Sequence, residues 1–217
     1  MSGSVQSDPD RPRLLLIRHG QSAWNQEGRI QGQMDPPLSE LGVWQASRLA
    51  DRLSRRRPVA IYSSDLDRSM ATATVSSQRL GLDVIAMPAL REVGLGQWEG
   101  RSRAEIAQQD PELWSTWLSH PSYDQVPQGE GAAAFAARVG AALDRICAAH
   151  PDPDSEVAVF THGGVVNMAL SICLPLPVAD HSPFRLENTS VTVIERVGSR
   201  LAITLVNDTC HLEPYAN

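Results

Sequence analysis

The stretch LLLIRHGQSAWN, residues 14–25, joins a short apolar run directly to an arginine, a histidine and a glycine. With Arg13 as its first position, the run covers residues 13–17 and is bounded by turn-like residues. A continuous apolar run of this length is typical of a strand that is buried on both faces of a parallel sheet. The sequence therefore predicts a rigid strand that carries Arg18, His19 and Gly20 at its carboxyl end.

Strand and helix signals alternate along the rest of the chain. Apolar runs predict strands over residues 59–62, 83–87 and 157–160, and two alternating runs predict a pair of strands over 190–197 and 200–207. Helical spacing predicts helices over residues 38–53, 63–80, 135–150 and 165–174. Strands that alternate with helices predict an α/β fold, a three-layer α/β/α sandwich with a mainly parallel central sheet.

The segments between these elements define the organisation of the domain. A Gly-, Gln- and Pro-rich loop is predicted from the first strand to Pro37. Residues 88–131 are less regular, with helical patches around 102–109 and 111–119, and are interpreted as an insertion over the C-terminal edge of the strands. The polar residues 1–12 predict a disordered tail, which leaves residues 13–217 as a single domain.

Composition narrows the class of protein. A formal net charge of −6 argues against binding nucleic acid through an overall positive potential. No apolar run approaches the length of a membrane span, so no membrane partner is expected. Cys147, Cys173 and Cys210 form no CxxC pair and are interpreted as reduced thiols, which predicts a cytoplasmic location.

Three polar clusters follow three of the predicted strands. They are Arg18 to Gly20, Ser63 to Arg68, and Thr161 to Gly164. Because ligands bind at the carboxyl ends of strands in open parallel sheets, two arginines and two histidines are expected to meet there. Arginine forks match phosphate oxygens, and helix N-termini add N–H donors at Arg68 and His162. The sequence therefore predicts a pocket for a phosphate group.

A histidine in such a pocket can act as a nucleophile. Its ring nitrogen can attack phosphorus and hold the phosphoryl group, provided that a carbonyl bonded to the other nitrogen fixes the tautomer. The departing alcohol also needs a proton, which a carboxylic acid can supply before its carboxylate activates water. Glu92 is the candidate for this acid/base, and Glu99 is the competing choice.

Five motifs, in this order, resemble those of the histidine phosphatase superfamily, the phosphoglycerate mutase-like group. An NTSV match follows them at residues 188–191. The motifs are LIRHGQSAWN (16–25), RIQGQMDPPLSELG (29–42), SSDLDRSMATA (63–73), LREVGLGQWEG (90–100) and THGG (161–164). A lone RHG would be a weak signal, whereas five ordered motifs are a specific one.

The resemblance implies a role for each matching residue. His19 matches the nucleophile, Glu92 the acid/base, and His162 the second histidine that binds the phosphoryl group. Arg18 and Arg68 match the phosphate clamps, although a structural ion pair is the alternative for each. The family uses no metal, and no cofactor is expected.

Some substrate contacts are less strongly supported. Asn25 matches a phosphate contact, but it could instead shape the loop through an Asx-turn. Arg29 and Gln31 are candidate substrate-binding residues that could equally lie on a solvated loop, and Gly32 and Gly163 complete the candidate set.

Departures from the mutase pattern favour the phosphatase branch. Mutases of the family carry YGxLQGLNK-like and AHGNSLR-like segments, where this chain has VGLGQWEGRSRAEI and THGGVVNMA. Gly131 departs from the phosphatase pattern, which often has a serine here, so a substrate contact from that hydroxyl is not expected. The two segments nevertheless favour the phosphatase branch. We therefore expect a metal-independent phosphomonoester hydrolase, with a cofactor-dependent mutase or other phosphoryl transferase as the first alternative. A catalytically silent binder of phosphorylated ligands is the second.

The expected partners are a small phosphorylated substrate and inorganic phosphate as product. Sugar phosphates, three-carbon acids, nucleotides and cobalamin-pathway phosphates all stay open as substrates. Residues Trp114, Trp117, His120 and Tyr123 are candidates for the pocket wall, and core packing is the preferred interpretation of the two tryptophans. A C-terminal edge strand could pair with a second copy to form a homodimer.

Overall fold

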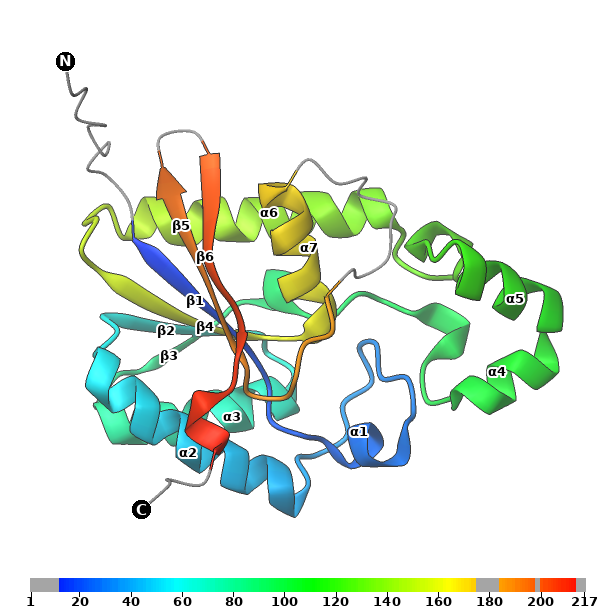
Figure 1. Cartoon of the computed structure of the whole chain (residues 1–217), viewed down its shortest axis with the longest axis horizontal. Helices are drawn as coiled ribbons and strands as arrows, with labels where there is room; N and C mark the ends of the chain where they lie inside the picture. Colours follow the sequence, from blue (N-terminus) through cyan, green and yellow to red (C-terminus); the bar gives the residue numbers. More distant parts are fainter. Residues whose placement is uncertain (1–11, 175–183, 198–199, 214–217) are drawn as a thin grey trace.

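The computed structural model describes residues 12–174, 184–197 and 200–213, which form a six-stranded sheet between two layers of helices (Figure 1). The order across the sheet is β3-β2-β4-β1-β5-β6; the first four strands are parallel to one another, and β5 runs antiparallel to both of its neighbours, β1 and β6. The strands are β1 (Arg13–Arg18), β2 (Ala60–Ser63), β3 (Val84–Ala86), β4 (Glu156–Thr161), β5 (Val191–Val197) and β6 (Arg200–Asp208). The predicted α/β/α sandwich with a mainly parallel sheet is confirmed.

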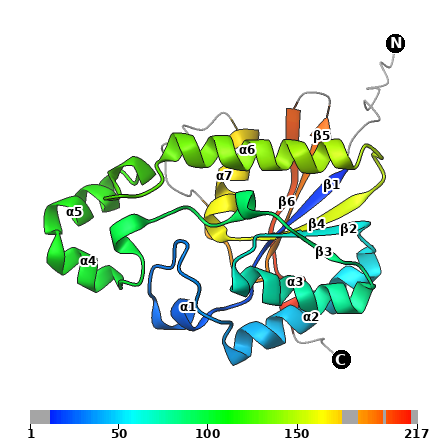
Figure 2. The same ribbon diagram turned by 180° about the vertical axis from the view of Figure 1, so that it is seen from behind.

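Helices α2 and α3 cover one face of the sheet, and α6 and α7 cover the other (Figure 2). The α-helices are α1 (Ala23–Glu27), α2 (Glu40–Arg56), α3 (Asp67–Leu80), α4 (Arg103–Gln109), α5 (Pro111–Ser119), α6 (Ala132–Ala149) and α7 (Gly163–Cys173). Short 3-10 helices are η1 (Pro88–Leu90), η2 (Gly96–Trp98), η3 (Tyr123–Gln125) and η4 (Cys210–Leu212).

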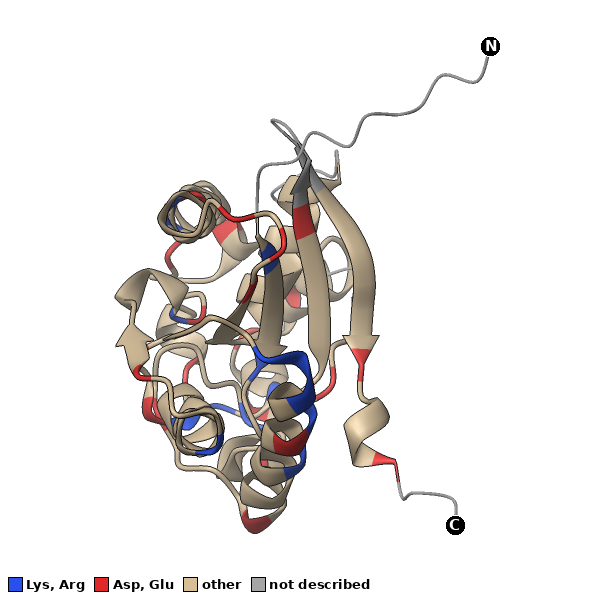
Figure 3. Cartoon of the chain, turned by 90° about the vertical axis from the view of Figure 1, so that its left-hand side faces the viewer, with Lys and Arg blue, Asp and Glu red and all other residues tan. Residues whose placement is uncertain are grey.

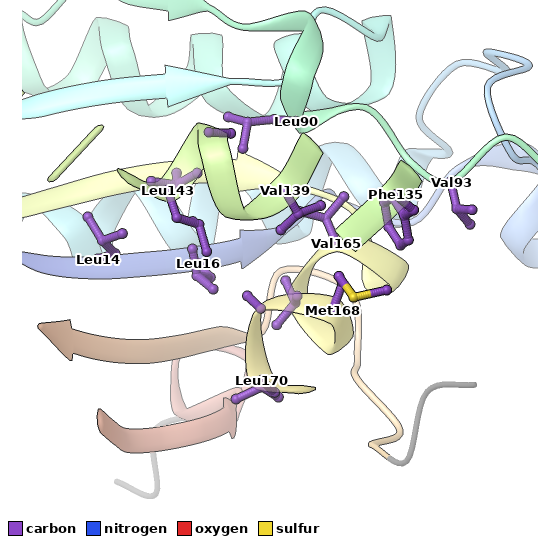
Figure 4. Close-up of a cluster of buried hydrophobic side chains, with 14 of the residues drawn as sticks. Leu14, Leu16, Leu90, Val93, Phe135, Val139, Leu143, Val165, Met168 and Leu170 are labelled. Carbon is purple, nitrogen blue, oxygen red and sulfur yellow. The ribbon is translucent and has the colours of Figure 1, made fainter. Parts of the chain in front are cut away.

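Strand β1 is buried on both sides because its apolar residues alternate between two cores. Leu15 and Ile17 pack with the α2–α3 side, whereas Leu14 and Leu16 pack with α6 and α7. Figure 4 shows the second core, where side chains of β1, α6, α7 and the segment around Leu90 converge. The strand is therefore held from both faces, as its continuous apolar run predicts.

The register of the parallel strands brings the two histidine motifs together. Arg18 lies opposite Thr161 in the β1–β4 pair, so that His19 and His162 each follow directly after paired strand ends. On the other side of β4, Ser63 of β2 lies opposite Phe160. Three motifs that are distant in sequence thus meet at one edge of the sheet.

The segment between β3 and α6 extends to one side of the sheet, beyond the carboxyl ends of the strands (Figure 1). It contains α4 and α5, close to the helical patches expected around residues 102–109 and 111–119. Trp98, Trp117 and Tyr123 are buried within it and join the α6–α7 core. The insertion therefore has its own aromatic packing, continuous with that of the domain.

The prediction of a loop from the first strand to Pro37 is wrong over residues 23–27, which form α1. Ser22 accepts a hydrogen bond from the Asn25 N–H, while the Asn25 side chain accepts one from the Ser22 N–H, which is a capping box. Gly28 ends the helix in the left-handed region. Five helical residues between these caps are too few for a periodic apolar pattern, which explains the error.

Other expectations concern the ends and the surface. Residues 1–11 of the predicted tail lie outside the described residues. No helix in the described part of the chain is long and apolar enough to cross a membrane. Figure 3 shows acidic and basic positions interspersed along the ribbon on the side away from the insertion. The described cysteines are all free.

Candidate active site

Two buried histidines lie side by side at the carboxyl edge of the sheet. The ring centroids of His19 and His162 are 5.1 Å apart, and the rings are tilted by 59°. Both side chains are almost fully buried, at 2% and 0% exposure. Burial, followed by the charges of Arg68 and Arg18, lowers the pKa of His19 well below its ordinary value of 6.5. The ring is therefore neutral at neutral pH, as a nucleophile must be.

Two contacts fix which nitrogen of His19 carries the proton. The Gly20 carbonyl lies 2.7 Å from Nδ1, so Nδ1–H donates to it. The Arg68 Nε–H donates to His19 Nε2 at 3.3 Å, and because a guanidinium can only donate, Nε2 must be unprotonated. The expected carbonyl partner is thus present, and Nε2 carries the lone pair of the ring, which accepts the Arg68 bond.

His162 is held differently. Its Nε2 lies 2.8 Å from the Ser64 hydroxyl, whereas its buried Nδ1 has no hydrogen-bond partner. Burial, with Arg68 and His19 as the next causes, lowers its pKa well below 6.5. His162 occupies the N-cap position of α7, and its side chain makes no capping hydrogen bond there. A neutral ring with an unpaired nitrogen is suited to accept or donate a bond to a bound group.

Arg18 and Arg68 supply the positive charge of the site. The Arg18 Nη1 donates to the Leu186 carbonyl, while its buried Nε has no partner. Burial lowers the pKa of the Arg18 guanidinium, and the Glu92 charge opposes that shift. A buried guanidinium N–H without a partner is unusual in a folded protein and indicates a group that a ligand completes.

Arg68 is 1% exposed and anchored by three residues of the preceding loop. Its Nη1 donates to the Met34 carbonyl at 2.7 Å and pairs with Asp35 at 3.2 Å, while Nη2 donates to the Gly32 carbonyl at 2.8 Å. Arg68 therefore does form a structural ion pair, and its Nε still faces His19. The same side chain can be positioned by the loop and directed at the site.

Glu92 and Glu99 have different surroundings. The Glu92 carboxylate accepts from the Gly164 N–H at 3.0 Å and from the Val93 N–H at 3.0 Å, and it lines the cavities described below. Glu99 instead accepts from the N–H groups of Gln33 and Leu95 and lines neither cavity. The structure brings Glu92, and not Glu99, to the cavity that His19 lines.

Two glycines permit these close approaches. A Cβ on Gly164 would lie 2.2 Å from the Glu92 Oε1, and a Cβ on Gly32 would lie 2.1 Å from the Glu99 Oε1. Gly32 also has a positive φ of 52°, which favours glycine. Both glycines therefore set the position of a carboxylate.

The polar side chains expected to bind substrate already form hydrogen bonds or ion pairs within the protein. Asn25 shapes the loop through the α1 capping box rather than through the expected Asx-turn, accepts a bond from Asn188 Nδ2, and also lines the cavities. Gln31 accepts a bond from the Ser22 hydroxyl. Arg29 pairs with Glu27 and Glu105 and is about one-third exposed, at 36%.

Two adjoining cavities open over these residues. The inner pocket, of about 430 Å³, is lined by His19, Arg68 and residues of the 24–32 loop. The outer chamber, of about 730 Å³, is lined by mainly aromatic and apolar residues of the insertion and by residues 184–188, which include the charged Arg185 and Glu187. Seven residues line both: Arg18, Asn25, Ile30, Glu92, Leu95, Arg103 and Gly163. His162 lies beneath the surface and lines neither cavity.

Most of the residues expected in the pocket wall line the outer chamber. Trp114, Trp117 and Tyr123 line it, whereas His120 does not. Trp117 also packs edge-on against Trp98, with ring centroids 4.8 Å apart. The two tryptophans therefore combine core packing with lining of the chamber. Gly131 lines neither cavity, and Asp124 accepts the Ala132 N–H at the start of α6.

Sequence reasoning missed several residues that support the site. Arg138 of α6 donates to the carbonyls of Ala89, Arg91 and Glu92 and pairs with Glu130, which fixes the segment that carries Glu92. Asn188 donates to the His19 carbonyl at 3.0 Å. A signal existed for Asn188 in the NTSV match, but Arg138 lies on the polar side of a helix with no distinguishing motif.

The described residues contain no group of three or more His, Cys, Asp or Glu side chains that could hold a metal ion. The charges that surround His19 instead come from guanidinium groups. An anion therefore fits the site better than a cation does.

Comparisons with known proteins identify the family of the chain. The sequence model of the histidine phosphatase superfamily (branch 1) matches residues 14–209 of this chain. A metal-independent phosphoserine phosphatase of Arabidopsis thaliana is 36% identical over 214 residues, covering 97% of this chain and 87% of that protein. A probable phosphoglycerate mutase GpmB of Proteus mirabilis is 38% identical, covering 84% of each chain.

A solved structure is similar over nearly the same length. The mycobacterial glucosyl-3-phosphoglycerate phosphatase, in complex with VO3, has a TM-score of 0.83 and 35% identity, covering 91% of this chain and 100% of that one. The extent of the family match and the identity to these relatives confirm the family that the motifs predict. The chain therefore belongs to the histidine phosphatase superfamily, branch 1.

Proposed function

We propose that the protein hydrolyses phosphomonoesters in two steps, through a phosphohistidine at His19. One observation carries this proposal. A neutral histidine has its unprotonated Nε2 in a pocket with two guanidinium groups, the buried Arg68 and the partly buried Arg18, whose Nε is unpaired. The arrangement combines a nucleophile with binding groups for a phosphate dianion.

In the first step, the Nε2 lone pair of His19 attacks phosphorus while the bond from phosphorus to the ester oxygen breaks. Glu92 gives its proton to the departing alcohol oxygen. For this attack, Arg68 must turn its Nε–H from His19 to a phosphoryl oxygen, and the length of that bond, 3.3 Å, indicates a weak contact that is readily exchanged. Substrate binding thus frees the nucleophile.

In the second step, the Glu92 carboxylate takes a proton from water, and the oxygen attacks the phosphohistidine. The bond between phosphorus and Nε2 breaks, and inorganic phosphate leaves. Arg18, Arg68 and the unpaired Nδ1 of His162 stabilise the negative charge on the phosphoryl oxygens. Gly163 and Gly164 place the first turn of α7 beside this charge.

The phosphatase and mutase alternatives differ in the fate of the phosphoryl group. The phosphoserine and glucosyl-3-phosphoglycerate phosphatases support hydrolysis, and GpmB supports the mutase as the alternative. The test uses 3-phosphoglycerate labelled with ³²P, incubated with the purified protein. Release of most of the label as inorganic phosphate is expected. Recovery of the label mainly as 2-phosphoglycerate would instead establish a mutase.

Metal independence has its own test. Treatment with EDTA should leave the rate of p-nitrophenyl phosphate hydrolysis unchanged, because the site's charge comes from arginines. Recovery of a lost rate on addition of Mg²⁺ or Zn²⁺ would contradict the proposal.

A cytoplasmic location and a homodimer are further parts of the proposal. Three free cysteines support a reducing compartment. Strand β6 at the edge of the sheet supports pairing with a second copy. Light scattering of the purified chain distinguishes a dimer from a monomer of 23.6 kDa.

A further inference from the structure

The turn that leads into β5, residues 187–190, supports the backbone that carries the nucleophile. The Thr189 N–H donates to the Arg18 carbonyl at 3.0 Å and, at the longer distance of 3.3 Å, to the His19 carbonyl. The Asn188 side chain donates to the same His19 carbonyl at 3.0 Å. On its other side, the His19 N–H donates to a carbonyl of β4 at 2.9 Å. The backbone of His19 is therefore held between β4 and this turn.

Thr189 has a strained backbone conformation within the turn. Its φ is +56°, in the left-handed region, which a β-branched residue adopts only at a cost. Such a conformation persists where the surrounding structure fixes it. Thr189 is fully buried, and its hydroxyl donates to the Asn188 carbonyl at 2.7 Å. The same hydroxyl oxygen can accept a bond, and His211 supplies the donor.

The His211 ring connects Thr189 to an arginine of α2. Its Nε2 lies 3.1 Å from the Thr189 hydroxyl, and its Nδ1 lies 3.3 Å from the Arg52 Nη1. Because a guanidinium can only donate, Nδ1 is the acceptor and the ring proton is on Nε2, where it donates to Thr189. Burial, with the Arg52 charge as the second cause, lowers the pKa of His211 to about 4. Arg52 therefore selects the tautomer in which a neutral His211 donates to Thr189.

Two arginines of α2 hold η4, the short helix that carries His211. Arg52 pairs with the Asp208 carboxylate at 2.6 Å and also donates to the Asp208 carbonyl at 3.3 Å. Arg48 donates to the His211 carbonyl at 3.3 Å. Neither α2 nor η4, both of which lie within the described residues, contributes to the lining of the two cavities. The imidazole of His211 is thus fixed by elements outside the site.

We infer that His211 is a positioning residue for the proposed phosphatase reaction, because it fixes Thr189 and, through that residue, the backbone that carries His19. The inference rests on the proposed function. His211 is 8% exposed and lines neither cavity, so it does not touch the substrate. Its effect on the reaction is indirect. The Nδ1–H of His19 donates to the Gly20 carbonyl, so a shift of this backbone also turns the attacking ring.

Replacement of His211 should lower the rate of the chemical step. His211→Leu should reduce kcat on p-nitrophenyl phosphate by about tenfold to a hundredfold with little change in KM, because a small displacement of a nucleophile is costly. His211→Gln should keep most of the activity, because its amide can donate to Thr189 while it accepts from Arg52. All rates are measured well below the melting temperature of each variant.

His150 provides a matched control for the loss of a histidine hydrogen bond. Its Nε2 lies 3.1 Å from the Tyr62 hydroxyl, the same length as the bond between His211 and Thr189. His150 follows the last residue of α6 and lines neither cavity. His150→Leu should therefore lower the melting temperature and leave kcat close to that of the wild type.

A double-mutant cycle tests whether His211 acts through Thr189. Thr189→Val keeps the β-branched shape and removes the hydroxyl, so it should lower kcat by at least as much as His211→Leu. In the Thr189→Val background, His211→Leu should lower kcat by less than about twofold, because the bond through which it acts is already absent. Losses that multiply in the double variant would mean that the two residues act independently.

NMR of protein labelled with ¹⁵N-histidine follows the nucleophile without relying on turnover. The ring signals of His19 are assigned by their absence in His19→Ala. His211→Leu should shift these signals, and His150→Leu should leave them at their wild-type positions. The readout reports the surroundings of the His19 ring whether or not the protein is active on a given substrate.

The outcomes separate positioning from a structural role. A lower melting temperature with unchanged kcat in His211→Leu would overturn the assignment, as would equal losses of kcat in His211→Leu and His150→Leu, or His19 signals that do not move in His211→Leu. A wild-type protein that does not hydrolyse p-nitrophenyl phosphate would contradict the proposed function instead. In that case the His19 signals still decide whether His211 positions the ring.

Discussion

The inner pocket and the outer chamber adjoin each other at Glu92, but they are built in different ways. In the inner pocket, His19 and Arg68 are almost fully buried and held by backbone carbonyls. In the outer chamber, the lining includes exposed side chains such as Leu118 and Arg185 on the insertion and the 184–188 segment. The comparison suggests that the sheet fixes the chemistry while the inserted segments set the choice of leaving group.

Replacement of the nucleophile should have the largest effect. His19→Ala removes the group that takes the phosphoryl unit, so hydrolysis of p-nitrophenyl phosphate should fall by about 10⁴-fold or more. His120→Ala is the matched control, because His120 lies on the insertion and lines neither cavity. Wild-type rates in His19→Ala would show that the inner pocket does not fix the chemistry, which is the distinction drawn between it and the outer chamber.

Replacement of Glu92 and of Glu99 should show which of the two glutamates donates the proton at the junction of the inner pocket and the outer chamber. Glu92→Gln cannot give a proton, so the rate on an alkyl ester should fall by about 10²–10³-fold, and less on p-nitrophenyl phosphate, whose leaving group needs no proton. Glu99→Gln should change both rates only slightly and lower the melting temperature, because Glu99 holds the N–H groups of Gln33 and Leu95. The reverse pattern of rates would make Glu99 the acid.

A pair of glycine replacements tests how closely Glu92 must be placed. Gly164→Ala would put a methyl group 2.2 Å from the Glu92 Oε1, so the carboxylate must move, and kcat on an alkyl ester should fall about tenfold to a hundredfold. Gly140→Ala is the control, because its Cβ would lie 3.8 Å from the Ile172 Cδ1 in ordinary contact and Gly140 lines neither cavity. Similar rates for the two variants would show that the position of Glu92 is not critical.

The smallest expected effect is on stability as the pH falls. His19 and His162 have pKa values well below 6.5 in the fold, mainly because of burial, and His211 has a pKa of about 4. Below pH 6.5 the unfolded chain therefore binds more protons than the folded one, so the free energy of unfolding decreases as pH falls. Each such histidine contributes roughly 1–2 kcal/mol of this loss between pH 7 and pH 5.

Urea unfolding at the two pH values measures this loss. His162→Ala should show a smaller pH dependence than the wild type, whereas His120→Ala should match the wild type. An unchanged dependence in His162→Ala would mean that this ring is not neutral in the fold.

The sheet and the candidate site could be predicted from sequence because their signals are local. The apolar run before Arg18 and the THGG motif after β4 both indicate strand ends, and the parallel topology brings strand ends to one edge. The capping box of α1 is also a local signal, but the helix was not predicted because five residues are too few to show a periodic apolar pattern.

The contacts that could not be predicted join distant segments. Arg138 reaches the segment around Glu92 from α6, and His211 reaches Thr189 from the end of the chain. Neither residue has a pattern of its own, because a polar side chain on a helix or near a terminus is usually solvated. Only the packing of the elements shows which backbone groups these side chains meet.

Trapping the phosphoryl group is the most direct test of the central claim. The wild-type protein is mixed with ³²P-labelled substrate, quenched in alkali within milliseconds, digested and analysed by mass spectrometry. We predict label on the imidazole of residue 19, formed and lost at rates that match turnover, and no labelled histidine in His19→Ala. Turnover with no phosphorylated histidine, or with label on any other residue, would contradict the account.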